Sequence, residues 1–256
     1  MLEFPIIHLF INMFVFLIYL ALFGLLYLKS TKQFGKTWEL TLLLCLFALC
    51  VALSSLTWGV KALIIQVDAS VEGWVWFWRL SITFLLLGAF LLGIFGLQLL
   101  PPPQPKYELQ KKLLRYGVTA LPIPVFFSFL LATPPSSLVV VTIFQVGYVK
   151  PPLVVWLFGL LAILYTALPT YSFLSYLSIS SFRVSPKGRR GARILFGLIS
   201  FGLGSFFGLT QVLGLLSSYE VGYVISQTVL ALGGLFLTAA FISPRRERVR
   251  GEAYRL

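Results

Sequence analysis

Seven long stretches of apolar residues follow one another along the chain, separated by short stretches that contain the charged residues. A helix of about 20 residues crosses the roughly 30 Å hydrocarbon layer of a membrane, and a charged side chain is costly at its centre. The pattern therefore predicts an all-α membrane protein, a seven-transmembrane helix bundle in a single domain. The expected spans lie at about 4–28, 40–62, 75–100, 116–133, 153–177, 194–217 and 221–242.

Proline pairs set the limits of two of these stretches. Pro134 and Pro135 precede a run of β-branched residues, which indicates that the fourth span ends just before them. Pro151 and Pro152 open the fifth span, because proline is tolerated in the first turn of a helix. We therefore expect an ordered outer loop over residues 134–152.

The positions of lysine and arginine predict the orientation in the membrane. Of the 20 basic residues, 17 lie in four segments, namely 29–36, 101–115, 178–193 and the tail 243–256. Basic residues are retained on the cytoplasmic side. The N-terminus is therefore expected outside the cell, and residues 243–256 are expected to form a basic cytoplasmic tail.

Composition supports a membrane protein and limits its partners. The chain of 256 residues is 59% hydrophobic and 11% charged, with a mean hydropathy of +0.94. A soluble domain could not keep so much apolar surface out of water. The net charge of +12 gathers at the cytoplasmic ends of the spans. That distribution indicates topology and attraction to anionic lipid headgroups, and not nucleic-acid binding.

The residues that most enzymes need are absent from the sequence. There is one histidine, no cluster of cysteine and histidine, no phosphate-binding loop and no acidic residue inside a span, so we expect no metal, no cofactor and no enzymatic activity. Asparagine, cysteine and methionine are scarce, which is typical of thermophiles. The expected location is the cell membrane of a thermophilic prokaryote, which the chain crosses several times.

Five polar side chains lie close to the outer ends of four predicted spans. They are His8 and Asn12 in span one, Arg79 in span three, Gln211 in span six and Gln227 in span seven. One interpretation is an outward-facing polar cavity that binds a ligand, in which the charge of Arg79 would favour an anionic group. In the alternative, Arg79 extends to the headgroups or pairs with an outer carboxylate, and the amides only join helices.

Small residues recur at helical spacing in two predicted spans. Ser200, Gly204 and Gly208 share one face of span six, and Ala89 and Gly93 share one face of span three. Such faces allow two helix backbones to approach closely. We expect both faces to pack against neighbouring helices.

Short sequence matches suggest one known family. They are Phe77-Trp78-Arg79-Leu80 at the start of span three, Thr133-Pro134 at the end of span four, Gly147-Tyr148 in the outer loop and Arg189-Arg190 before span six. In these features the chain resembles the N-terminal seven-transmembrane sensor region of membrane histidine kinases, without the kinase module. The resemblance implies a sensor with its N-terminus outside.

Three functions remain compatible with the sequence. The first is a non-enzymatic seven-helix membrane sensor or ligand-binding module with an outward-facing polar cavity. The second is an accessory or assembly subunit of a larger membrane protein complex, which would require a membrane protein partner. The third is a small-molecule transporter, for which matching proline kinks in spans one and five would be expected.

Overall fold

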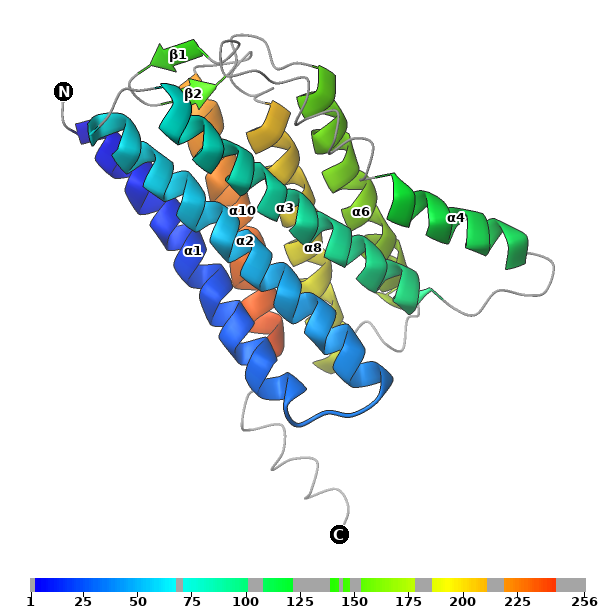
Figure 1. Cartoon of the computed structure of the whole chain (residues 1–256). Helices are drawn as coiled ribbons and strands as arrows, with labels where there is room; N and C mark the ends of the chain where they lie inside the picture. Colours follow the sequence, from blue (N-terminus) through cyan, green and yellow to red (C-terminus); the bar gives the residue numbers. More distant parts are fainter. Residues whose placement is uncertain are drawn as a thin grey trace.

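The computed structural model describes residues 3–67, 71–100, 108–121, 139–142, 145–147, 153–177, 186–210 and 219–242. These residues form helices and one short pair of strands (Figure 1). In chain order the elements are α1 (Glu3–Ser30), α2 (Lys36–Val67), α3 (Val71–Leu99), α4 (Glu108–Ala120), β1 (Val139–Thr142), β2 (Gln145–Gly147), α6 (Leu153–Leu177), α8 (Pro186–Thr210) and α10 (Tyr219–Phe241).

Six of the described helices are long and apolar enough to cross a membrane. They are α1, α2, α3, α6, α8 and α10, and they coincide with the first three and the last three predicted spans. Of the predicted fourth span, residues 122–133 lie outside the described residues, as do residues 211–217 of the sixth span and the tail 243–256. The chain is thus a helical bundle with the composition of a multi-pass membrane protein.

Helices α4 and α8 each begin about two turns before the span that the apolar pattern predicts. Helix α8 begins at Pro186, whose fixed φ suits the first position of a helix, so the basic residues that follow belong to its first two turns. Helix α4 begins at Glu108, within the basic segment 101–115 that precedes the predicted fourth span. The Lys112 ammonium lies 3.0 Å from the Glu108 carboxylate one turn away, a spacing that supports a helix.

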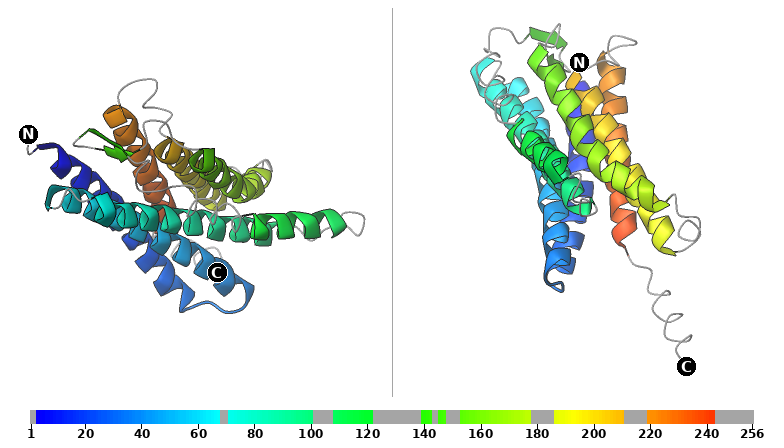
Figure 2. Two further views of the ribbon diagram at one scale, coloured as in Figure 1. Left: turned by 45° about the horizontal axis from the view of Figure 1, so that its top comes forward. Right: turned by 90° about the vertical axis from the view of Figure 1, so that its right-hand side faces the viewer.

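The six long helices form a closed ring. Each packs against two others, in the order α1, α2, α3, α6, α8, α10 and back to α1, and the two views of Figure 2 show the helices side by side. Aromatic residues fill the centre of the ring. Phe47 of α2 and Phe201 of α8 are fully buried, and their rings meet edge to face with centroids 4.8 Å apart.

Contacts between helices define the direction of each helix. Gly93 of α3 approaches Tyr165 of α6, and three residues further on Gly96 approaches Pro169. Because both sequence numbers increase together, α3 and α6 run parallel. The end of α3 and the start of α6 therefore lie at opposite ends of the bundle (Figure 1), and the chain between residues 100 and 153 has to return from one end to the other.

Other helix pairs follow a regular pattern. The ring of Tyr19 in α1 reaches the carbonyl of Leu230 in α10, and Lys29 reaches Phe241 further along both helices, so α1 and α10 are parallel. Helices that follow one another directly, such as α1 and α2, are antiparallel. The start of α1 and the end of α10 consequently lie at opposite ends of the bundle.

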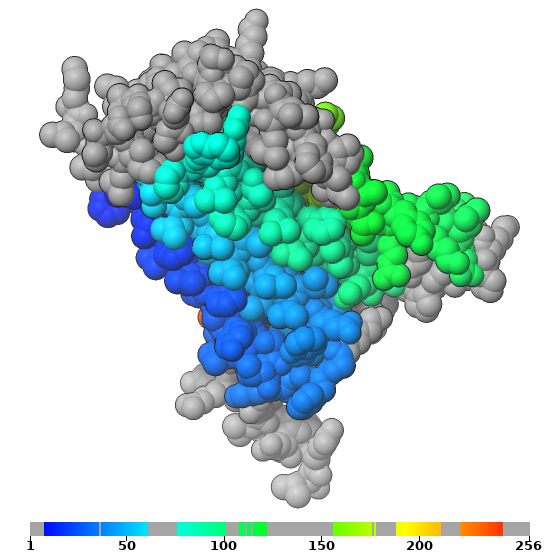
Figure 3. Space-filling model, viewed as in Figure 1, coloured from blue at the N-terminus to red at the C-terminus, as the bar shows by residue number. Residues whose placement is uncertain are grey.

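Helix α4 projects from the side of the ring (Figure 3). Its buried residue Val118 faces the bundle, where the Tyr165 hydroxyl donates a hydrogen bond of 2.8 Å to the Val118 carbonyl. Leu109, Leu113 and Tyr116 lie on a face of the helix that is exposed. The helix thus joins the ring near its C-terminal end and presents an apolar stripe to the surroundings.

A hairpin lies in the segment that was expected to be an ordered outer loop. Strand β1 pairs antiparallel with β2, with Val139 opposite Gly147 and Val140 opposite Val146. The valine run of β1 suits a strand because β-branched side chains fit the pleated surface. Both strands belong to the stretch between α4 and α6.

Glycine allows close packing between α8 and α10, as the sequence predicts. A Cβ atom on Gly204 would lie 2.9 Å from the backbone nitrogen of Leu230. Ser200 and Gly208 on the same face also approach α10. The small-residue face of α8 is therefore an internal helix contact, which confirms that prediction.

Candidate functional site

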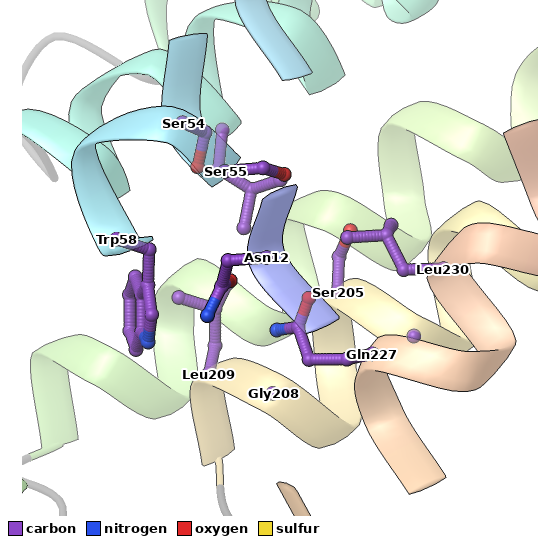
Figure 4. Close-up of a pocket in the computed structure, with 11 residues that line it drawn as sticks. Asn12, Ser54, Ser55, Trp58, Ser205, Gly208, Leu209, Gln227 and Leu230 are labelled. Atoms are coloured by element: carbon purple, nitrogen blue, oxygen red, sulfur yellow. The ribbon is translucent and has the colours of Figure 1, made fainter. Parts of the chain in front are cut away.

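A polar cavity lies inside the ring, between α1, α2, α3, α8 and α10 (Figure 4). Its volume is about 30 Å³, which exceeds the roughly 10–15 Å³ that one water molecule needs. Its position is in the half of the bundle that contains the start of α1 and the end of α8. The lining residues are Asn12, Ser54, Ser55, Trp58, Leu85, Gly204, Ser205, Gly208, Leu209, Gln227 and Leu230.

Three buried polar atoms of the lining have no hydrogen-bond partner within the described residues. They are Oδ1 of Asn12, Oγ of Ser205 and Oε1 of Gln227. Asn12 is 1% exposed and Ser205 is 2% exposed. A buried polar group without a partner costs about 1–3 kcal/mol. A polar molecule in the cavity would remove that cost for three groups at once.

Contacts to neighbouring residues fix the orientation of the Asn12 side chain. Its Nδ2 donates a hydrogen bond of 2.7 Å to the carbonyl of His8 and one of 2.5 Å to the hydroxyl of Tyr223. A carbonyl oxygen can only accept, so Nδ2 must face His8 and Oδ1 must be the free acceptor. Figure 4 shows the carboxamide of Gln227 reaching from α10 towards Asn12.

His8 lies beside the cavity and supports its wall. The imidazole is buried and stacks on the ring of Tyr223, with centroids 4.4 Å apart and an angle of 17° between the planes. Its Nε2 lies 3.4 Å from the Tyr223 hydroxyl. His8, Tyr223 and Asn12 thus form one cluster that connects α1 to α10, and only Asn12 lines the cavity.

Arg79 does not line the cavity. Its guanidinium carbon lies 5.3 Å from the centroid of the Trp76 ring, which is a cation–π contact. Trp76 is 65% exposed on α3. The sequence predicted that five side chains form one site. Of these, Asn12 and Gln227 line the cavity and His8 lies next to it. Gln211 lies outside the described residues.

Several residues of the cavity wall were not expected from the sequence. Helix α2 contributes Ser54, Ser55 and Trp58. The Ser81 hydroxyl donates a hydrogen bond of 2.8 Å to the Ser54 carbonyl, which joins α3 to α2 next to the cavity. Serine gives a weak signal because it usually bonds to a carbonyl of its own helix.

The chemistry of the lining is neutral. No acidic or basic residue lines the described cavity, and the described part of the chain contains no group of histidine, cysteine or acidic side chains that could hold a metal ion. Amide oxygens and hydroxyls can bind a molecule that donates hydrogen bonds.

Comparison with protein-family models, with curated proteins and with solved structures gives no match for this chain. The class of the protein therefore rests on the fold and the site alone. They define a helical bundle with six helices suited to a membrane and a neutral polar cavity in its core.

Proposed function

We propose that the chain is a non-enzymatic seven-span membrane module that binds a small molecule in this cavity, in the manner of a sensor. The parallel packing of α3 and α6 supports a seventh crossing between them, because the end of α3 and the start of α6 lie at opposite ends of the bundle. The distribution of basic residues puts the N-terminus outside the cell. In that orientation the cavity lies in the outer half of the membrane.

The observation that carries the proposal is the group of unpartnered atoms in the cavity. Oδ1 of Asn12, Oγ of Ser205 and Oε1 of Gln227 come from three helices. Polar groups inside a membrane protein normally join helices by bonding to one another. Here they leave acceptors in the wall of a cavity between the helices, which is the arrangement of a binding site.

The lining favours an uncharged ligand that donates hydrogen bonds. A charged ligand would be buried without a counter-charge, which is costly in a membrane. Because Arg79 lies outside the lining, its charge does not favour an anion at this place. The size of the cavity limits the ligand to a few non-hydrogen atoms.

Two small probes of similar size separate hydrogen bonding from simple filling of space. Formamide donates two hydrogen bonds, whereas acetonitrile donates none. We expect formamide to raise the midpoint of thermal unfolding relative to acetonitrile at equal concentration, since a ligand stabilises the state to which it binds. Asn12→Leu should remove this difference, because leucine matches the shape of asparagine without its acceptor.

Gln98→Leu is the matched control. The buried Oε1 of Gln98 also has no hydrogen-bond partner among the described residues, but Gln98 does not line the cavity. The difference between formamide and acetonitrile should persist in this variant. Equal midpoints with both probes in the unmodified protein, or an unchanged difference in Asn12→Leu, would contradict the proposal.

A further inference from the structure

Three basic side chains converge at the end of the bundle where α1 ends, α8 begins and α10 ends. The Lys29 ammonium donates a hydrogen bond to the Phe241 carbonyl, and the Arg193 guanidinium donates one of 3.1 Å to the Ala239 carbonyl. Lys29 Nζ lies 5.5 Å and Arg190 Cζ lies 5.0 Å from the centroid of the Phe241 ring. The charges of Lys29 and Arg190 are therefore no further apart than the sum of these two distances.

The positive charge of this basic cluster, Lys29, Arg190 and Arg193, exceeds the negative charge that it meets among the described residues. The last carbonyls of a helix carry about half a negative charge in total. Within the described residues the one ion pair is Lys112 with Glu108 on α4, so no described carboxylate neutralises the cluster. An anion that bridges these cations would relieve their mutual repulsion.

The cluster lies at a boundary between charged and apolar surface. Lys29 is next to the last residue of the apolar stretch His8–Ser30, and Arg190 and Arg193 fall in the first turns of the stretch Gly188–Thr210. Both arginines are exposed. One turn further along α8 from Arg193, Phe196 is 56% exposed, and beside it Phe236 of α10 is 39% exposed. The centroids of the two rings are 5.9 Å apart.

We propose that the basic cluster binds the phosphodiester group of an anionic phospholipid, whose acyl chain lies along Phe196 and Phe236. Arginine suits this role because its planar guanidinium donates hydrogen bonds to phosphate oxygens. The apolar rings next to the cations distinguish a lipid from free phosphate, which would gain nothing from them. This site is separate from the polar cavity and does not depend on the function proposed for it.

Lipid selectivity measured by native mass spectrometry tests this proposal. Protein in detergent is titrated with phosphatidylglycerol or with phosphatidylcholine of the same acyl chains, and the ratio of the two affinities is taken within each variant. We expect the unmodified protein to prefer phosphatidylglycerol. Arg190→Gln should lower that preference about fivefold, the effect of one basic side chain near an anionic membrane surface.

Arg115→Gln is the control, because Arg115 is an exposed basic residue of α4 outside the cluster. It should leave the preference unchanged. Since each ratio compares two lipids on one variant, a loss of stability cannot imitate the result. Equal affinity for both lipids in the unmodified protein, or the same loss in Arg115→Gln as in Arg190→Gln, would overturn the proposal. Competition by millimolar inorganic phosphate would identify a site for free phosphate instead and would also overturn it.

Discussion

Substitution of Gly204 by alanine tests the close contact between α8 and α10. The new Cβ would lie 2.9 Å from the backbone nitrogen of Leu230 and 3.1 Å from the carbonyl oxygen of Ser226. Favourable contacts between heavy atoms lie near 3.5–4.0 Å. Both neighbours are helix backbone, which cannot rotate away as a side chain can, so the two helices would have to separate.

The size of the effect follows from two opposing contributions. Overpacking of this kind costs about 1–3 kcal/mol, whereas replacing glycine by alanine inside a helix contributes up to about 1 kcal/mol of stability. Gly24→Ala in α1 supplies the control, because no described atom other than its own helix backbone and chain neighbours lies within 4 Å of the Cβ that it adds. Gly204→Ala should therefore be less stable than Gly24→Ala by about 1–3 kcal/mol.

Reversible unfolding in mixed micelles, followed by circular dichroism, gives the two free energies of unfolding. The comparison between the variants cancels the common gain in helix propensity. If Gly204→Ala unfolds at the same denaturant concentration as Gly24→Ala, the two helices do not approach as closely as described. The reasoning about the small-residue face would then be refuted.

Two further predictions concern the cluster beside the cavity and the topology. Tyr223→Phe removes the acceptor of the 2.5 Å hydrogen bond from Asn12 Nδ2 and should lower the free energy of unfolding by about 0.5–2 kcal/mol. Tyr171→Phe is the control and should have little effect, because Tyr171 is 65% exposed. Equal losses in the two variants would show that the hydrogen bond adds no stability. Reporter fusions test the seven crossings, and a cytoplasmic signal at Ser136 with an outside signal at Gly188 would contradict them. Cytoplasmic reporters are expected after Gln33, Gln110 and Gly188 and at Leu256, and outside reporters near Ser70, Ser136 and Ser218.

The sequence was sufficient to predict the long helices but not which of their faces are buried. Six predicted spans coincide with described helices because length and apolar composition are enough to identify them. On α1 the exposed Phe14 and Leu17 are as apolar as the buried Val15 and Leu22. Where lipid replaces water, both faces of a helix are apolar, so periodicity cannot identify the inner one.

The candidate site was predictable where a polar residue is rare in its surroundings. Asn12 and Gln227 line the cavity because an amide in an apolar span has to face other protein groups. Arg79 is long enough to extend away from its own position, so its place in the span did not determine where its charge lies. Ser205 and Tyr223 gave no signal, because their roles depend on which helices are neighbours in the ring.

The most direct test of the proposed ligand site is to identify what the protein holds when it is purified from its own cells at native expression. Small molecules are released by denaturation and measured by mass spectrometry, with Asn12→Leu and Gln98→Leu prepared in the same way. We expect a small uncharged hydrogen-bond donor, in stoichiometric amount, from the unmodified protein and from Gln98→Leu, and a strong reduction in Asn12→Leu. The same amount from Asn12→Leu, or a stoichiometric protein partner without any such molecule, would contradict the binding site, and the second result would favour an accessory subunit.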